Sequence, residues 1–348
     1  MRIGMFSTTL PETHLKPGGV DVLIERLCNQ LVTRGHTVRM HSFSPAPSGF
    51  RADHVKLEPD RWRRSPPFRM AVAPLIFSRM NVSDLDVVHL HGEDWFYARR
   101  SIPTIRTFYG SARAEARTAT SIRRRASQSL FFGLEVLASR LATATYGLIP
   151  GDGRVYRTVG ALGCGIDMAP DASTERHPAP AILFVGTWSG RKRGHLVADA
   201  FAEHVLPSNP DAELWMVSDE APATPGVTHF SRPSDAEITR LYQRAWVFCL
   251  PSSYEGFGIP YLEAMAAGTA VVATPNPGAE HLLAQGRYGR IVEDGQIGVA
   301  LAELIDDGDL RAALGDLGRE RAKAFSWDRV VAAHEAAYAD AIARRRRS

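Results

Sequence analysis

The chain is poor in cysteine and has no long apolar run, and each scarcity excludes a class of protein. Its three cysteines, Cys28, Cys164 and Cys249, stand far apart at unrelated spacings, which argues against a disulfide framework and against a zinc cluster. No stretch of about 18 apolar residues occurs, so no transmembrane helix is expected. The amino terminus shows neither the long apolar region nor the small-residue cleavage site of a signal peptide. We therefore expect a cytoplasmic protein.

An excess of charge of one sign is also lacking, since the formal net charge is only +3. Lysine is rare, so arginine carries most of the positive charge, and the arginines gather in the first half and in the tail. The clusters are Arg61, Arg63 and Arg64, then Arg113 and Arg117, then Arg123 to Arg125, and finally Arg344 to Arg347. Clustered basic residues attract anionic lipids and phosphorylated ligands. The clusters of the first half therefore leave open a peripheral contact with the inner face of a membrane, and no nucleic-acid partner is expected.

A length of 348 residues exceeds one ordinary core and predicts two domains. Short apolar strands alternate with amphipathic helices in both halves, which is typical of parallel, doubly wound sheets. We expect domains over 1–170 and 181–325, joined by a linker rich in proline, alanine and serine. The segment 326–348 is predicted to be a helix that packs back on the first domain. The predicted fold class is α/β, with two Rossmann-like domains that face each other across a cleft.

The pattern also predicts the bounds of individual elements. Strands are expected at 2–7, 36–42, 86–90, 103–108, 146–149, 181–186, 212–218, 246–250, 270–274 and 289–292. Helices are expected at 20–31, 127–141, 194–203, 235–244, 299–305, 310–324 and 327–343.

Two glutamates eight positions apart, Glu255 and Glu263, enclose a glycine loop and the start of a short helix. Apolar strands precede and follow this segment, which places it at the carboxyl end of a strand, where open α/β sheets bind ligands. Gly258 allows the backbone to approach a ligand closely, and a helix that begins near Ile259 offers free amides to phosphate oxygens. Glu263 can accept hydrogen bonds from two neighbouring hydroxyls, such as those of ribose. The segment predicts a nucleotide-sugar site.

A second glycine-rich strand end, Gly186-Thr-Trp-Ser-Gly-Arg-Lys-Arg-Gly194, carries three consecutive cations. Arg191, Lys192 and Arg193 stand just before a predicted helix, where they could neutralise a diphosphate leaving group as its charge develops. Gly18-Gly19 opens the first predicted helix and is a weaker signal of the same kind.

His89 and His91 lie two positions apart on a predicted strand and therefore face the same side of its sheet. A metal site would need a third ligand that this spacing does not supply. No Asp-x-Asp pair stands at the carboxyl end of a predicted strand either, so we expect no metal ion and no other cofactor. A structural and a catalytic role both stay open for these histidines.

Several segments together resemble glycosyltransferase family 4. They are Gly18-Gly19, Asp86-Val-Val-His-Leu-His-Gly92, Gly163-Cys-Gly-Ile-Asp167, the run from Tyr254 to Thr274, and Asn276-Pro-Gly-Ala-Glu280 followed by Gly289. The glutamate pair with its intervening Gly-Phe-Gly is the most specific of them. The resemblance implies a GT-B fold and metal-independent transfer of a sugar, with retention of configuration, from a nucleotide-diphosphate sugar. We expect a UDP- or GDP-sugar as donor and a hydroxyl of a small-molecule or lipid-linked molecule as acceptor.

The resemblance also implies roles for single residues. In that family the glutamate that matches Glu255 contacts the donor sugar, and the one that matches Glu263 holds the ribose hydroxyls. Further residues to which the resemblance assigns donor binding are Gly19, Arg193, Phe257 and Gly258. No enzyme nucleophile is implied, because the departing phosphate helps to deprotonate the acceptor.

Two positions depart from the family pattern. Thr187 stands where an arginine is frequent, so the positive charge must come from Arg191 to Arg193. Tyr109 stands where a histidine is frequent, and a phenol can donate a hydrogen bond but adds no charge near neutral pH. Tyr109 and His91 are therefore both candidates for the catalytic group beside Glu255. The alternative functions are a nucleotide-sugar epimerase and an inactive carbohydrate-binding protein.

Overall fold

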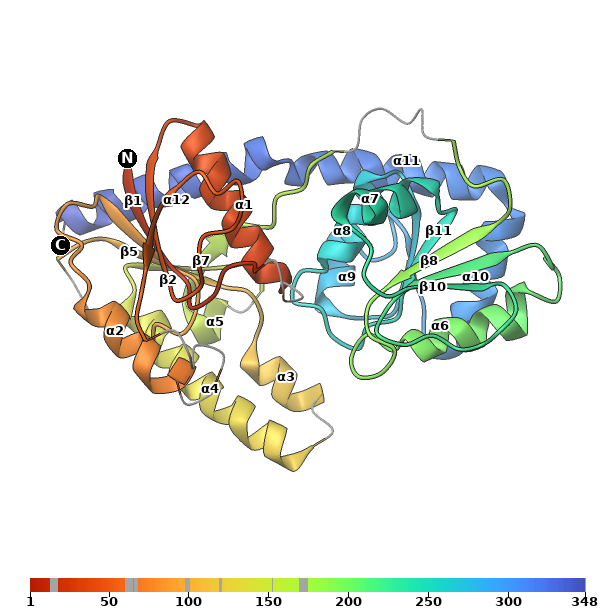
Figure 1. The fold of residues 1–348 in the computed structure, drawn as a ribbon, viewed down its shortest axis with the longest axis horizontal. Coiled ribbons are helices and arrows are strands. Elements are labelled where there is room, and N and C mark those ends of the chain that lie inside the picture. Colours follow the sequence, from red (N-terminus) through yellow and green to blue (C-terminus); the bar gives the residue numbers. More distant parts are fainter. Residues whose placement is uncertain are drawn as a thin grey trace. The chain divides into compact units, whose positions relative to one another are not determined.

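Figure 1 shows the computed structural model of the chain, which describes residues 1–12, 18–59, 65, 68–97, 101–118, 121–151, 153–168 and 175–347. The chain divides into two compact units. Unit 1 comprises Met1–Gly165 and Trp327–Ser348, and unit 2 comprises Ile166–Ser326. The first boundary thus falls before residue 170, since Ile166 forms a parallel bridge with Ser326 of unit 2.

Unit 1 is built on a parallel sheet in which, within the described residues, seven strands follow the order β3-β2-β1-β4-β5-β6-β7. The strands are β1 (Arg2–Phe6), β2 (Thr37–Ser42), β3 (Asp53–Lys56), β4 (Val87–Leu90), β5 (Thr104–Phe108), β6 (Ala144–Gly147) and β7 (Thr158–Ala161). The helices are α1 (Gly19–Thr33), η1 (Phe68–Val72), α2 (Ala73–Arg79), α3 (Ala112–Thr118), α4 (Ile122–Leu141), α5 (Gly153–Tyr156) and α12 (Trp327–Arg347). The strand order reverses between β1 and β4, which is the point at which such sheets bind ligands.

Unit 2 repeats this design with six described strands in the order β10-β9-β8-β11-β12-β13, again parallel. The strands are β8 (Ala181–Val185), β9 (Glu213–Val217), β10 (Val227–Phe230), β11 (Val247–Leu250), β12 (Ala270–Ala273) and β13 (Arg290–Ile291). The helices are α6 (Gly194–Ala200), η2 (Phe201–Val205), α7 (Asp235–Arg244), α8 (Ile259–Ala266), α9 (Pro277–Leu282), η3 (Asp294–Gln296), α10 (Ile297–Asp306), α11 (Gly308–Ala322) and η4 (Lys323–Phe325). Its order reverses between β8 and β11, so the segments that follow these strands lie at the switch point.

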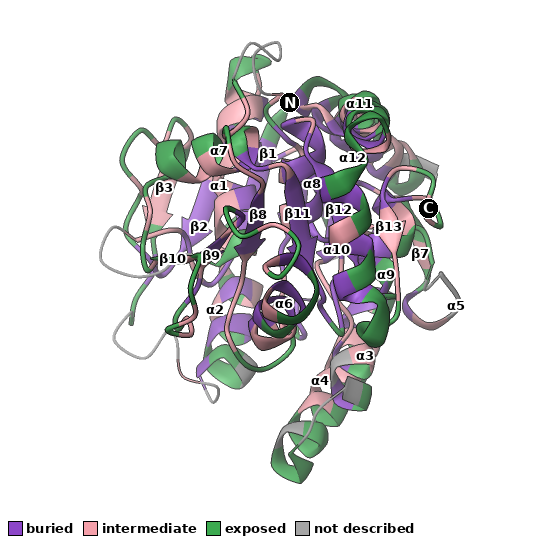
Figure 2. Cartoon of the chain, turned by 90° about the vertical axis from the view of Figure 1, so that its right-hand side faces the viewer, coloured by how far each residue is buried: buried purple, intermediate pink, exposed green. Residues whose placement is uncertain are grey.

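The inner strands were predictable because helices cover both faces of each sheet. β4, β5, β11 and β12 are buried at every position, as expected of parallel strands in a doubly wound fold. Figure 2 shows buried residues concentrated in the central strands and exposed ones on the surrounding helices.

Three strands escaped prediction, and two other elements are displaced from their expected bounds. β3, β7 and β10 lie at sheet edges and are half exposed, so none of them forms a buried apolar run. The strand expected at 146–149 is β6 at Ala144–Gly147, and α4 begins at Ile122 rather than at residue 127.

The final helix belongs to unit 1, where α12 contacts α1, β4 and β5. Tyr338 anchors it, because its Oη lies 2.9 Å from Nδ1 of the buried His89 on β4. On the same helix, Glu335 pairs with Arg34 at 3.1 Å and with His36 at 2.8 Å.

The expected linker lies partly outside the described residues. Its carboxyl-terminal part is tied to unit 2 by Arg176, whose guanidinium donates to Thr269 Oγ1 at 2.7 Å and to the carbonyl oxygens of Gln243 and Ala245 at 2.9 and 2.7 Å. Among the described helices of both units, none combines the length and the apolarity needed to cross a bilayer.

Candidate functional site

Glu255 is the centre of a charged cluster at the switch point of unit 2. Arg191 and Lys192 follow β8, whereas Ser252 and Glu255 follow β11. Three donors converge on Oε1 of Glu255: Lys192 Nζ at 2.7 Å, Ser252 Oγ at 2.7 Å and Arg191 Nη1 at 3.1 Å. Since Glu255 is only 5% exposed, two cations hold one buried carboxylate, and the cluster keeps an excess positive charge of one.

Lys192 is the more deeply buried of the two cations. Burial lowers the pKa of its ammonium group, while the charge of Glu255 and the hydrogen bond to it act in the opposite direction. Repulsion by Arg191 also lowers this pKa. The charged state of Lys192 therefore depends on Glu255, as expected of a buried pair in which each ion offsets the desolvation of the other.

A buried polar network that the sequence analysis missed holds the Glu255 loop. The carbonyl oxygen of Ser252 accepts from Thr274 Oγ1 and from Asn276 Nδ2, both at 3.1 Å. Asn276 Nδ2 also lies 3.1 Å from Tyr261 Oη, and Asn276 Oδ1 accepts from the Ala279 amide to cap α9. An Asn followed by Pro and Gly is a helix-start signal, so the cap itself was visible in the sequence. The contact between Asn276 and Ser252 was not visible in the sequence, because these residues lie on opposite sides of β12 along the chain.

Glycine is required at two points beneath this loop. Gly258 adopts φ +90°, and a Cβ at this position would overlap the ring of Tyr261. A Cβ at Gly278 would lie 2.6 Å from the carbonyl oxygen of Phe257. The ring of Phe257 is buried against Phe325, with centroids 5.6 Å apart, so its side chain serves the core and its backbone forms the loop.

Arg193 does not join the cluster around Glu255. Its Nε donates to the Pro251 carbonyl oxygen at 2.7 Å, its Nη1 contacts Asp294 Oδ2 at 2.6 Å, and its Nη2 donates to Thr274 Oγ1 at 3.2 Å. These bonds tie the segment after β8 to the loop after β11 and to η3. The structure thus separates the three consecutive cations, because Arg191 and Lys192 meet Glu255 while Arg193 binds Pro251, Asp294 and Thr274.

Glu263 lies half-buried on α8, one helix turn beyond the loop. Burial raises the pKa of Tyr242 on α7, and the charge of Glu263 raises it further. The charge of Glu263 also favours the ammonium form of Lys192. Glu263 therefore shares an electrostatic environment with the cluster.

The two other predicted catalytic residues, His91 and Tyr109, meet inside unit 1. His91 Nδ1 and Tyr109 Oη are hydrogen-bonded to each other. His89 and His91 do face the same side of the sheet, since their ring centroids lie 4.0 Å apart. His89 is wholly buried, with Nε2 2.8 Å from Thr107 Oγ1, so its partners are structural.

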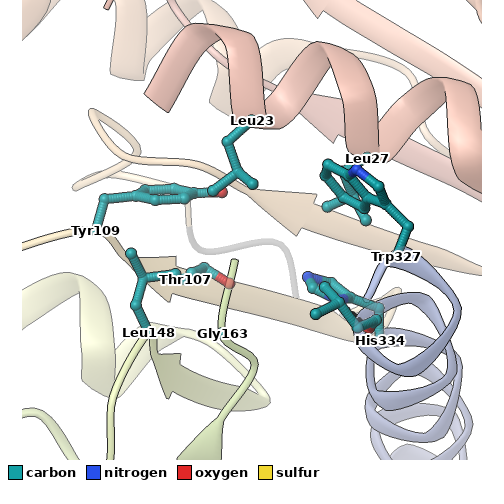
Figure 3. Close-up of a pocket in the computed structure, with 9 residues that line it drawn as sticks. Leu23, Leu27, Thr107, Tyr109, Leu148, Gly163, Trp327 and His334 are labelled. Carbon is teal, nitrogen blue, oxygen red and sulfur yellow. Dashed lines mark hydrogen bonds between the residues drawn. The ribbon is translucent and has the colours of Figure 1, made fainter. Parts of the chain in front are cut away.

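Burial sets the protonation of this pair. It lowers the pKa of His91 to about 3, with a smaller contribution from His334. Burial also raises the pKa of Tyr109 well above its usual range. Both side chains are therefore neutral near pH 7. Tyr109 and Thr107 line a small cavity within unit 1 and face Trp327 and His334 across it (Figure 3).

Gly19 begins α1 and is exposed. The preceding loop at 13–17 lies outside the described residues. Asp21 stands in the first turn of the same helix and accepts a hydrogen bond from Thr9 Oγ1 at 2.9 Å.

Models of two glycosyltransferase families match most of the chain. The family model "Glycosyl transferases group 1" matches residues 167–321, and "Glycosyltransferase Family 4" matches residues 17–146. The MMP alpha-(1->4)-mannosyltransferase of Mycolicibacterium hassiacum is 28% identical, over 99% of this chain and 99% of its own. The phosphatidyl-myo-inositol mannosyltransferase of Mycolicibacterium smegmatis is also 28% identical, over 95% of this chain and 92% of its own.

A solved structure shows the same fold. Anabaena HepE in complex with UDP-glucose superposes with a TM-score of 0.70 at 15% identity, over 97% of this chain and 100% of that one. Two Rossmann-like units of parallel strands, matched by family models in both halves, define the GT-B architecture. The chain therefore belongs to glycosyltransferase family 4 and is an enzyme that transfers a sugar.

Proposed function

We propose that the enzyme binds a nucleotide-diphosphate sugar at the switch point of unit 2 and transfers the sugar, with retention of configuration, to a hydroxyl of a lipid-linked or small-molecule acceptor. The cluster of Arg191, Lys192 and Glu255 carries this proposal, because its excess positive charge lies at the sheet edge where such folds bind ligands and Arg191 is exposed there. HepE, which has the same fold, binds UDP-glucose. UDP- and GDP-sugars are the donors to be tested first.

In this proposal Arg191 and Lys192 neutralise the diphosphate as negative charge develops on it during bond cleavage. Glu255 contacts the donor sugar, and its two cationic partners hold its carboxylate in place. The departing phosphate accepts the acceptor proton, so no protein nucleophile is needed. These side chains can supply the charge that a metal ion supplies elsewhere, and we propose that turnover is independent of divalent metals and of any cofactor.

The remaining donor contacts follow the family resemblance. Glu263 accepts hydrogen bonds from the ribose hydroxyls, while backbone amides complete the diphosphate site. Those amides belong to Phe257 and Gly258. We propose that Arg193 positions the loop after β11, because its guanidinium is hydrogen-bonded to Pro251, Thr274 and Asp294.

We assign acceptor binding to unit 1 and a role in the transfer step to Tyr109 and His91. Tyr109 is the member of the pair that contacts a substrate hydroxyl, and His91 orients it through their hydrogen bond. The lipid-linked alternative is supported by the relative from Mycolicibacterium smegmatis, whose name includes the lipid phosphatidyl-myo-inositol. The name of the other relative, from Mycolicibacterium hassiacum, specifies no lipid, so both acceptor classes are tested.

A melting-temperature screen against UDP-, GDP-, ADP- and dTDP-sugars tests donor binding. A donor present at 100 times its dissociation constant should stabilise the protein by about 2.7 kcal/mol. Failure of every donor to raise the melting temperature would contradict the proposal. Product released from the successful donor is then analysed by NMR, where an inverted anomeric centre would exclude retention.

The Glu263→Gln variant tests the donor site more sharply. Loss of charged hydrogen bonds worth about 1.5 to 3 kcal/mol should weaken donor affinity roughly ten- to hundredfold. Glu203→Gln, at an exposed position of the same unit, should leave affinity unchanged. Turnover should persist in EDTA. A new epimer formed from donor alone would favour an epimerase, and absence of nucleotide release with every acceptor would favour an inactive binding protein.

A further inference from the structure

The outer face of α4 is apolar although it lies on the surface of unit 1. We define this face by its exposed residues Ile122, Ala126, Leu130, Gly133 and Leu137. Their spacing of three or four positions places them on one side of the helix. Ile122 is 85% exposed, Leu130 55% and Leu137 42%. Large side chains of this kind, gathered in a row on a surface, mark a contact site.

The opposite side of α4 fixes this orientation. Glu135 points inward, where its Oε2 accepts from Tyr156 Oη at 2.7 Å. Ala138 and Ser139 are buried on the same side. A roll of the helix that buried Leu130 and Leu137 would expose or break the Glu135 contact, so α4 cannot hide its outer face within unit 1.

Positive charge flanks the outer face. Arg123, Arg125 and Arg140 are exposed on α4, and Arg113 and Arg117 are exposed on the neighbouring α3. The acidic residue of α4, Glu135, is turned to the interior. The apolar row is therefore bordered by cations without a carboxylate among the exposed residues of this helix.

The row has the length expected of an interfacial helix. Ile122 and Leu137 are fifteen positions apart, which corresponds to about 22 Å along the helix axis. The amino-terminal end of α4 projects beyond the sheet of unit 1 (Figure 1), and Figure 2 shows this end as exposed. Helices with an apolar face and flanking arginines lie in the plane of a bilayer surface, with the arginines at the lipid phosphates.

We infer that the outer face of α4 docks unit 1 on a membrane surface that carries anionic lipid. A nucleic acid would pair with the arginines but leave Ile122, Leu130 and Leu137 in water. A second copy of the chain would bring the same arginines against each other. An anionic bilayer satisfies both the apolar row and the charge, and this inference does not depend on which donor or acceptor the enzyme uses.

Sedimentation of the full-length chain with lipid vesicles tests the inference. The protein should bind vesicles that contain phosphatidylglycerol and not vesicles of phosphatidylcholine alone. Leu130→Gln combined with Leu137→Gln should reduce binding at least about tenfold, because two apolar side chains lose their transfer to lipid. Val299→Gln, at a residue of unit 2 that is 61% exposed, is the matched control and should bind as the parent chain does.

The charge contribution is tested separately with Arg123→Gln and Arg125→Gln. Their combination should weaken binding and flatten its dependence on salt, since salt screens contacts between exposed charges. All these positions are exposed, and circular dichroism checks that the variants fold. A Leu130→Trp variant should show fluorescence quenching by brominated lipids in anionic vesicles only.

Three results of the vesicle experiments would overturn the inference. They are no binding to phosphatidylglycerol vesicles, unchanged binding of the double leucine variant, and an unquenched tryptophan at position 130. A concentration-dependent dimer that the leucine substitutions abolish would assign the face to a second copy and would equally contradict a membrane role.

Discussion

One carboxylate oxygen, Oε1 of Glu255, accepts a hydrogen bond from Ser252 and forms ion pairs with Arg191 and Lys192. The two cations were predictable as part of a basic run after a strand. Ser252 was not singled out, since a serine after a strand is common and its partner is known only when the loop is folded. Because Ser252 is held in turn by Thr274 and Asn276, it transmits the geometry of the core to Glu255.

We predict that Ser252→Ala lowers turnover about tenfold or more while donor affinity changes little. The substitution removes a hydrogen bond to a charged group, worth about 1.5 to 3 kcal/mol, but leaves both cations. Steady-state kinetics and donor titration separate the two effects. Ser253→Ala, at the adjacent exposed serine, is the control, and Ser252→Thr should restore part of the rate. Equal turnover in Ser252→Ala and Ser253→Ala would remove Ser252 from a positioning role.

Tyr109→Phe is expected to lower turnover more than donor affinity. The phenylalanine keeps the ring but removes the hydroxyl that is bonded to His91, so a substrate hydroxyl loses its partner and His91 loses its orientation. Rates measured at saturating donor test this expectation. Tyr146→Phe, at a buried tyrosine of the same unit, serves as the control, and wild-type rates in both variants would place Tyr109 outside the site.

Helix α8 and its loop were predicted closely because their signals are local. A glycine with positive φ precedes the helix at Gly258, Pro260 occupies its first turn, and Gly268 ends it with φ +70°. Helix α7 has the bounds that the sequence predicts. Ser234 and Glu237 form a reciprocal capping box that fixes its start. The edge strands lacked such signals. Their half-exposed sequences show neither a continuous apolar run nor a clear alternation of apolar and polar residues.

Gly258→Ala should destabilise unit 2 by about 1–3 kcal/mol, since an L-residue is strained at that φ and its Cβ would overlap Tyr261. Denaturant unfolding followed through the tryptophans of unit 2 measures the loss. Gly295→Ala, where a Cβ would meet nothing within 4 Å, should stay within about 0.5 kcal/mol of the parent chain. Equal stability of the two variants would show that the loop tolerates a side chain at position 258.

Each unit places its strand-order reversal between its first and fourth strands in chain order, so both present strand ends for ligand contact. The final helix completes unit 1 rather than the unit that precedes it in the chain. Its His334 stands near His89, with ring centroids 5.7 Å apart, and near Tyr338 on its own helix. Closure of this helix on unit 1 therefore buries a group of neutral histidines and tyrosines.

This burial predicts that unit 1 loses stability as the pH falls from about 6.5 to about 4. Burial lowers the pKa of His334 to about 4, whereas an unfolded histidine titrates near 6.5. Below the latter value the unfolded chain binds a proton that the folded unit does not, which costs about 1.4 kcal/mol per pH unit for each such histidine. Above about pH 6.5 the histidine is neutral in both the folded and the unfolded chain, so it no longer changes the free energy of unfolding with pH.

Hydrogen exchange of α12 peptides between pH 4 and 7, corrected for intrinsic rates, measures this loss. His334→Gln should flatten the dependence by about 1.4 kcal/mol per pH unit over that window. His281→Gln, a substitution in unit 2, should leave the α12 profile unchanged. An unaltered slope in His334→Gln would show that this histidine is not buried neutral.

The sequence by itself determined the features that depend on near neighbours. Apolar periodicity specified the inner strands and most helices, and glycine and proline specified the Glu255 loop. The motifs themselves resemble those of the family. Only the tertiary structure decided which cations meet Glu255, that Arg193 binds Pro251, Thr274 and Asp294 instead, and that Asn276 and Ser252 support the loop. These contacts join segments that are far apart in the chain, so they follow from strand order and packing, which local sequence does not encode.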